Sequence, residues 1–274
     1  MTTSPLLEFL LSRSRGELLA WQDQLSAARR FNRSVREVEL IALQHGLLPA
    51  RYIRNRKTIT TEGQLRLCSA SVVVVGCGGL GGYVLELLAR LGVGRLRAVD
   101  PDCFEEHNLN RQLLSTVENL GQAKVDAARL RIGAVNPAVE LEPHQCAFSA
   151  ANGAELLQGA EVAVDALDNL ATRRELAKQC LQLRLPLVQG AIAGWYGQLG
   201  IQLPDRAGSG LHWIPAEGEQ GGLEKELGNP SFTPAAIASL QAAEVCKLLL
   251  GAGGVPGERT LWVDLQAMEF LIPE

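Results

Sequence analysis

Two basic side chains and one carboxylate in this sequence have the types and spacing to act on a nucleotide. Arg111 lies in a polar segment, residues 105–112, and Lys124 stands at the start of a predicted helix. Fixed cations stabilise the negative charge that builds up when pyrophosphate is expelled, whereas a nicotinamide dehydrogenase has little use for them. Asp168 follows a buried strand, and a carboxylate facing a triphosphate is repelled unless Mg²⁺ lies between them. We therefore predict phosphate chemistry with Asp168 as the magnesium ligand; the alternative for the two cations is an ordinary surface position.

A glycine cluster supplies a place for the nucleotide. Four consecutive valines, 72–75, predict a strand covered on both faces, and they run into a helix start that contains Gly76, Gly78, Gly79 and Gly81. Glycines let the backbone turn tightly and approach a phosphate at a helix N-terminus. The next predicted strand, 95–100, ends at Asp100, where such folds usually hold ribose hydroxyls. The pattern predicts a dinucleotide or ATP site; the alternative is a purely structural strand-turn-helix unit.

A third predicted strand brings further polar residues to the same edge. Asp168 and Asn169 fall at the carboxyl end of the strand 161–165, where ligands of open α/β sheets bind. Asp165, three residues earlier, is interpreted as a structural acid or a helix N-cap, with metal contact as the alternative. The site therefore draws on at least three strands.

The elements that position these residues alternate between strand and helix from residue 71 onward. This order predicts right-handed crossovers and a Rossmann-like, doubly wound, mainly parallel sheet. Antiparallel strands are expected at 194–203 and twice within 261–272, and the long Gly- and Pro-rich segment at about 204–233 is read as a mobile functional loop, with a disordered spacer as the alternative. The predicted parallel-sheet units are strands 71–75, 95–100, 138–143, 161–165 and 186–190 and helices 79–91, about 121–133, 170–182 and 234–250.

Residues 1–50 are predicted to form a separate helical extension. One amphipathic helix is expected over 5–30, and a second from the N-cap Ser34, with Glu37 completing a capping box, to Gln44. This end of the chain is rich in arginine, although the whole chain carries a net charge of −4. A basic arm on an acidic body could bind nucleic acid, but the leucine and arginine spacing favours packing on its own body or on a second subunit.

The cysteine spacing and the hydropathy of the chain indicate in which cellular compartment the protein works. Six cysteines show no Cys-x-x-Cys spacing, which favours reduced, mostly buried thiols and argues against a zinc site. No segment approaches the ~18 apolar residues of a membrane span, and the run 6–11 is too short for a secretory signal. We therefore expect a cytoplasmic protein without membrane contact.

Taken in order, the motifs resemble those of the ThiF/MoeB/HesA family, the bacterial relatives of ubiquitin-activating enzymes. The resemblance spans roughly residues 51 to 272, and the ordered set is far more specific than any single motif. It is carried by Gly76-Cys77-Gly78-Gly79-Leu80-Gly81, Asp100, Asn108-Leu109-Asn110-Arg111-Gln112, Gly121-Gln122-Ala123-Lys124, Asp168-Asn169 with Arg173, 186–191, Gly197-Gln198, 239–244 and 264–270.

The resemblance implies a homodimer that uses ATP and Mg²⁺ to adenylate the C-terminal glycine of a small ubiquitin-like sulfur carrier ending in Gly-Gly. Such carriers serve molybdopterin, tungstopterin or thiamine-type cofactor biosynthesis. Residues 51–274 would be the ATP-binding adenylyltransferase domain. Arg54, in a segment similar to the family's Arg-Tyr-x-Arg, would reach the partner subunit's ATP. The resemblance places at the ATP site Gly79, Asp100, Asn108, Arg111, Lys124, Asp168 and Asn169.

Two departures from the family pattern narrow the expected chemistry. The paired Cys-x-x-Cys motifs that hold structural zinc in many relatives are missing, and residues 204–234 contain no cysteine to bond the carrier. Adenylation is then the only covalent step expected, and a separate protein would donate sulfur. The alternatives are a tRNA threonylcarbamoyladenosine dehydratase-like enzyme, disfavoured by the acidic body, and a non-catalytic nucleotide-binding scaffold.

Overall fold

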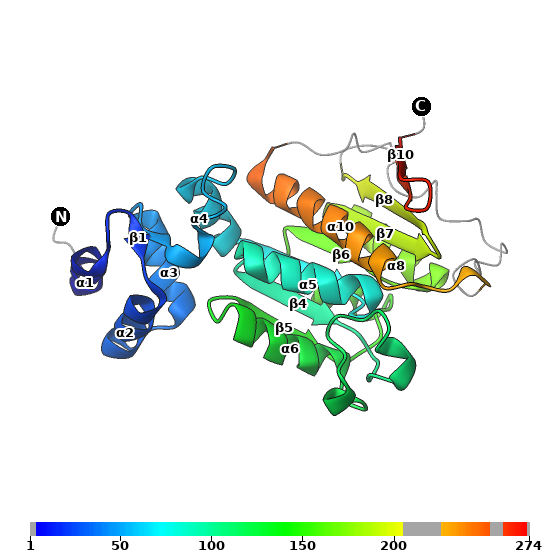
Figure 1. The fold of residues 1–274 in the computed structure, drawn as a ribbon, viewed down its shortest axis with the longest axis horizontal. Helices are drawn as coiled ribbons and strands as arrows, with labels where there is room; N and C mark the ends of the chain where they lie inside the picture. The colour runs from blue at the N-terminus through cyan, green and yellow to red at the C-terminus, as the bar shows by residue number, and fades with distance from the viewer. Residues whose placement is uncertain (1–3, 205–225, 253–259, 273–274) are drawn as a thin grey trace.

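The valine run at 72–75 forms the centre of an eight-stranded sheet in the computed structural model, which describes residues 4–204, 226–252 and 260–272 (Figure 1). The strand order is β10-β9-β8-β7-β6-β3-β4-β5. Pairing is parallel from β7 to β5 and antiparallel from β7 to β10, which confirms the predicted fold class. The elements of this body are α4 (Thr61–Ser69), β3 (Ser71–Val75), α5 (Gly79–Leu91), β4 (Arg95–Val99), η2 (Glu106–Asn108), η3 (Val117–Asn119), α6 (Lys124–Val135), β5 (Glu140–His144), α7 (Gly153–Leu157), β6 (Val162–Asp165), α8 (Leu170–Gln182), β7 (Leu187–Ala193), β8 (Tyr196–Gln202), α10 (Phe232–Leu250), β9 (Leu261–Asp264) and β10 (Glu269–Leu271).

Helices cover both faces of the parallel strands. Val72 and Val74 pack with α5, α6 and α10 on one face, while Val73 and Val75 pack with α8 on the other. Figure 1 shows α5 and α10 side by side in front of the sheet. A continuous apolar strand is buried on both faces only when helices flank it on either side, and this explains the unbroken valine run.

Most predicted elements of the body are found within a few residues of their expected bounds. The strand at 71–75 and the helices at 79–91 and 170–182 have the predicted limits, whereas α4 and α7 were not predicted. Helix α10 begins two residues before the expected start and ends at Leu250, followed by the C-cap Gly251, whose φ of 68° is left-handed. Most of the predicted loop at about 204–233, residues 205–225, lies outside the described residues. None of the described helices is long and apolar enough to cross a membrane.

The prediction of one helix over residues 5–30 is wrong. The structure has α1 (Pro5–Arg13), β1 (Leu18–Leu19) and α2 (Trp21–Phe31), and β1 pairs in parallel with β2 (Leu48–Pro49). The chain reverses at Gly16, whose φ of 60° is left-handed and breaks the helix. The apolar spacing continues across this turn because both helices pack into one small core.

The second helix of the extension follows the prediction. Helix α3 (Val35–Gln44) starts at Ser34, whose side chain accepts from the backbone N–H of Glu37, while the Glu37 carboxylate accepts from the N–H of Ser34. The short helix η1 (Ala50–Tyr52) then leads toward α4. This is the reciprocal capping box that the spacing indicated.

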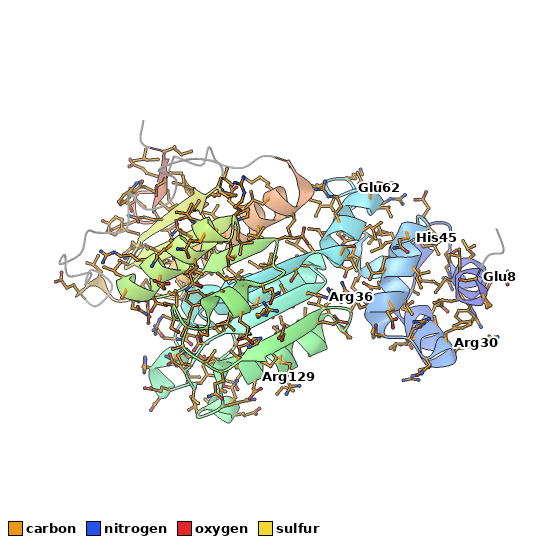
Figure 2. The ribbon with its side chains drawn as sticks, turned by 180° about the vertical axis from the view of Figure 1, so that it is seen from behind. Glu8, Arg30, Arg36, His45, Glu62 and Arg129 are labelled. Atoms are coloured by element: carbon orange, nitrogen blue, oxygen red, sulfur yellow. The ribbon has the colours of Figure 1, made fainter. Side chains whose placement is uncertain are left out.

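The basic arm packs on its own body, one of the two arrangements we favoured. Figure 2 shows Arg36 at the junction between the N-terminal helices and the sheet, where its guanidinium donates to the carbonyl of Cys68 at 3.2 Å. The guanidinium of Arg51 lies 2.5 Å from the carboxylate of Glu39 in α3 and donates to the side-chain oxygen of Asn136 in the body at 2.6 Å. Glu39 is fully buried, and burial raises its pKa to about 7 although Arg51 opposes the shift. Buried polar groups of the extension thus meet partners in the α/β body.

Candidate active site

A cavity of about 270 Å³ opens where β3, β4 and β6 end and α5 begins. This is the carboxyl edge of the parallel strands, the usual ligand position in open α/β sheets. Eight of the predicted site residues line this cavity: Gly76, Gly78, Gly79, Asp100, Arg111, Lys124, Asp168 and Asn169. Predicted residues that do not line it are Gly81, Asn108 and Arg54.

The glycine loop is shaped by two close backbone contacts. Gly76 has a φ of 96°, and a side chain there would collide with the carbonyl of Ala166; one at Gly81 would collide with the carbonyl of Gly76. Gly81 therefore serves packing. Gly78 and Gly79 face the cavity at the start of α5, which has no side-chain cap. The uncapped N–H groups of this helix end form an anion-binding position.

Asp100 lies on the cavity wall but also supports the glycine loop. Its two carboxylate oxygens accept from the backbone N–H groups of Cys77 at 2.6 Å and Asp102 at 2.8 Å. Burial raises the pKa of Asp100, while Lys124 and these N–H donors oppose that shift. Asp100 thus fixes the loop that carries the helix start, and its remaining acceptor positions border the cavity.

Lys124 is buried, with 8% of its side chain exposed, and its ammonium lies 2.9 Å from the carboxylate of Asp102. The side chain of Asp102 is 61% exposed and also lines the cavity. Asp102 was not predicted as a site residue, although it follows Asp100 by two positions. A buried ammonium has three donors, so Lys124 can keep this partner and still bind an anion in the cavity.

Arg111 reaches the cavity from the turn that begins with η2. Its guanidinium donates to the carbonyl of His107 at 3.0 Å and to the side chain of Asn110 at 2.9 Å, so the side chain is held. Asn108, by contrast, is buried in the turn, where its Oδ1 accepts from the N–H of Glu105 at 2.9 Å. Gln112, the residue after Arg111, was not predicted as a site residue. It lines the cavity, and its buried Oε1 has no hydrogen-bond partner among the described residues.

Asp168 and Asn169 have different surroundings. The Asp168 carboxylate is exposed at the cavity and makes no hydrogen bond or ion pair with a described residue. The Asn169 side chain caps α8 by accepting from the N–H of Thr172 at 2.9 Å. Asp165 is fully buried and accepts from the N–H of Leu167, which supports its interpretation as a structural acid.

Arg54 is exposed and lies between η1 and α4, in the segment that leads to the amino end of β3. The cavity is at the carboxyl end of the same strand. Within one chain, the fold therefore separates Arg54 from the other predicted site residues.

One cysteine that lines the cavity was not predicted as a site residue. Cys146, in the loop after β5, is half-buried and lines the cavity. Cys77 is fully buried, and burial raises its pKa well above the usual thiol value. Cys246, on α10, is half-buried against the core. Nothing in the sequence pattern distinguishes Cys146, because only the fold brings this loop next to the glycines.

The described residues fit a magnesium–nucleotide complex. An uncapped helix start and two cations suit phosphate oxygens, and Asp168 offers a carboxylate without another partner. No group of three or more His, Cys, Asp or Glu side chains that could hold a metal occurs in the described part of the chain. Magnesium needs no such group, since it is usually held by one or two carboxylates, substrate phosphates and water.

Sequence comparison places the chain among enzymes. The sequence model of the ThiF family matches residues 52–271. The SAMP-activating enzyme E1 of Haloferax volcanii is 37% identical over 212 residues, 76% of this chain and 78% of the relative. The sulfur carrier protein adenylyltransferase of Thermus thermophilus is 38% identical over 223 residues, 75% and 79% of the two chains. The adenylyltransferase and sulfurtransferase MOCS3 of Anopheles gambiae is 37% identical over 226 residues, and the match covers 51% of it.

Solved structures share the fold at low sequence identity. E. coli MccB bound to MccA-N7isoASN has a TM-score of 0.73 with 17% identity, over 96% of this chain and 81% of MccB. PaaA has a TM-score of 0.68 with 22% identity, over 100% of this chain and 83% of PaaA. The second match includes the N-terminal helices as well as the α/β body.

Proposed function

The chain belongs to the ThiF family, and we propose that it is an adenylyltransferase that uses ATP to activate the C-terminal carboxylate of a small ubiquitin-like sulfur carrier ending in Gly-Gly. The observation that carries this proposal is the meeting of Lys124, Arg111 and Asp168 at the uncapped start of α5. The relatives named for sulfur-carrier and SAMP activation support the acceptor class.

In the proposed reaction the protein must stabilise the negative charge of the phosphates and position the carrier's carboxylate. The carrier's terminal carboxylate is ionised at neutral pH and attacks the α-phosphorus, so no protein base is needed. The α–β bridging bond breaks, pyrophosphate leaves, and a mixed anhydride of AMP and the carrier forms. Lys124 and Arg111 would bind the phosphate oxygens on which negative charge builds. Asp168 would hold Mg²⁺, which when bound offsets the charge of the phosphates.

An exposed apolar face beside the cavity supports a protein acceptor. In the register of β8, β9 and β10, Trp262 lies opposite Leu271, on the face away from the buried Val263 and α10. Tyr196, opposite Asp264, shares this face, and these three large side chains are 45%, 57% and 46% exposed. Large apolar side chains gathered on a surface mark interaction sites. Ile192, near the end of β7, lines the cavity, and the β7–β8 turn joins it to Tyr196 on this face.

We predict that Trp262→Glu raises the KM for the carrier about tenfold or more, because a charge would be buried where the carrier contacts an apolar side chain. The affinity for ATP should not change. Steady-state adenylation with varied carrier measures the first quantity, and nucleotide titration the second. Leu130→Glu, an exposed leucine on α6 outside this face, is the matched control. Equal KM values for Trp262→Glu and the parental protein would place the carrier elsewhere.

We further propose that the enzyme acts as a homodimer in the cytoplasm and passes its adenylated carrier to a separate sulfur donor. The six cysteines are free, and the thiols of Cys68 and Cys180 have their pKa values raised to about 12 by burial. Burial makes these two thiols poor nucleophiles. The proposal that adenylation is the end of the chain's own chemistry rests on the lack of a cysteine in residues 204–234. Molybdopterin, tungstopterin or thiamine-type synthesis remains the proposed destination.

The proposal is tested by exchange of labelled pyrophosphate into ATP. We expect exchange only when a carrier ending in Gly-Gly is added, since the reverse reaction needs the carrier adenylate. A carrier lacking its last glycine is the control and should support no exchange. Exchange that requires tRNA instead, or that never occurs although ATP binds, would contradict the proposal.

A further inference from the structure

We propose that Arg173 is a positioning residue: together with Asp165, it fixes the turn 166–169 and so places Asp168 for magnesium. The inference rests on the proposed function, in which Asp168 holds the metal. It concerns a buried ion pair beside Asp168, in which Arg173 itself lines the cavity and for which the proposed adenylation has no chemical step. Arg173 is 3% exposed and Asp165 is fully buried.

The two side chains hold both polar groups of one residue of the turn. The Oδ1 atom of Asp165 accepts from the N–H of Leu167 at 3.0 Å, and the Nε of Arg173 donates to the carbonyl of Leu167 at 2.9 Å. Asp168 is the next residue. Since the peptide bond is planar, fixing the carbonyl of Leu167 also fixes the direction in which the chain enters Asp168.

Arg173 ties this turn to the neighbouring strand. Its Nη2 donates to the carbonyl of Gly190 in β7, and its Nε lies 3.7 Å from the carboxylate of Asp165, which compensates the buried charge. A guanidinium offers several donors in one fixed plane and can bridge two carbonyls at once. A lysine ammonium in the same place keeps the charge but loses this planar bridge.

The turn is confined at its other contacts as well. Ala166 donates to the carbonyl of Val75 at 2.9 Å, and its own carbonyl lies against Gly76, where no side chain fits. Asn169, at the end of the turn, caps α8. Of these four residues, Asp168 is the one whose side chain has no partner among the described residues. The arrangement resembles that of metal sites in which outer side chains orient the ligand.

Binding of a non-hydrolysable ATP analogue, measured by titration calorimetry with Mg²⁺ and with EDTA, tests this role. The parental protein should bind the analogue more tightly with magnesium. Arg173→Lys should weaken this magnesium-dependent gain by about 10- to 100-fold, the usual effect of losing an outer-shell partner, while affinity in EDTA stays within about twofold. Lys178→Gln, which removes an exposed cation from the same helix, should leave both affinities unchanged.

A double-variant cycle separates positioning from direct binding. If Arg173 acts through Asp168, the Arg173→Lys and Asp168→Asn double variant should bind no more weakly than Asp168→Asn alone. Three results would overturn the inference. The first is a double variant whose loss of affinity is the product of the two single losses, and the second is an Arg173→Lys protein that binds the analogue as much more tightly with Mg²⁺ as the parental protein does. The third is an equal loss of affinity in EDTA, which would show that Arg173 contacts the nucleotide itself.

A second variant guards against a folding defect. Should Arg173→Lys unfold at a lower temperature, Asp165→Asn keeps an oxygen for the N–H of Leu167 but removes the charge that orients Arg173. It should lose part of the magnesium gain, and an unchanged gain would refute the pair's role. Because the readout is nucleotide binding without carrier, a parental protein that binds ATP and magnesium but shows no carrier-dependent exchange would refute only the proposed function.

Discussion

Lys124→Ala is expected to slow carrier-dependent pyrophosphate exchange by about 100-fold or more. The ammonium is buried at the cavity, where little water can replace it, and a transition-state interaction of this kind contributes about 3 kcal/mol. The rate of label exchange at saturating ATP and carrier measures the loss. Lys124 also offsets the burial of Asp100, so the unfolding temperature of the variant is measured together with the rate.

Two companion variants sharpen this result. Asp102→Asn keeps the buried ammonium but removes its anionic partner, and it should slow exchange less than Lys124→Ala does. Lys178→Gln removes a surface cation and serves as the control for net charge. Exchange by Lys124→Ala at the parental rate, in a protein with an unchanged unfolding temperature, would mean that the cavity is not where pyrophosphate leaves.

The fold could be predicted wherever local chemistry and tertiary packing agree. The valine run 72–75 is continuous because it is buried on both faces, and Ser34 with Glu37 caps a helix by contacts within four residues. The turn at Gly16 was missed for a physical reason. The leucines before and after it enter the same small core, so the apolar spacing runs on although the backbone reverses.

Those residues of the candidate site that lie at the ends of predicted strands or the starts of predicted helices could be predicted from the sequence. Gly78, Lys124 and Asp168 follow or precede predicted elements, so the parallel topology alone brings them to one edge. Gln112 and Cys146 lie in irregular segments whose course depends on tertiary contacts. The sequence also cannot distinguish an asparagine that binds a ligand from one that caps a turn, because a short amide serves both roles.

Mixing two inactive variants should restore activity, if Arg54 serves the partner subunit. Arg54 is exposed near the amino end of β3, whereas its own chain's cavity is at the carboxyl end. An arginine so placed can act on a nucleotide only across a subunit interface. Arg54→Ala alone should therefore lose about 100-fold in exchange rate, as expected for a cation lost from the transition state.

A hybrid dimer of Arg54→Ala with Lys124→Ala contains one site with both cations and one site with neither. Random exchange of equal amounts makes half of the dimers hybrid, so roughly a quarter of the parental activity should return. Mixing Lys124→Ala with Asp168→Ala is the control: both changes fall in the same chain's cavity, and every hybrid site lacks one of the two groups. Activity that stays low after subunit exchange has been verified by mass would show that Arg54 does not act across the interface. Recovery in the control pair would instead mean that Lys124 and Asp168 belong to different sites.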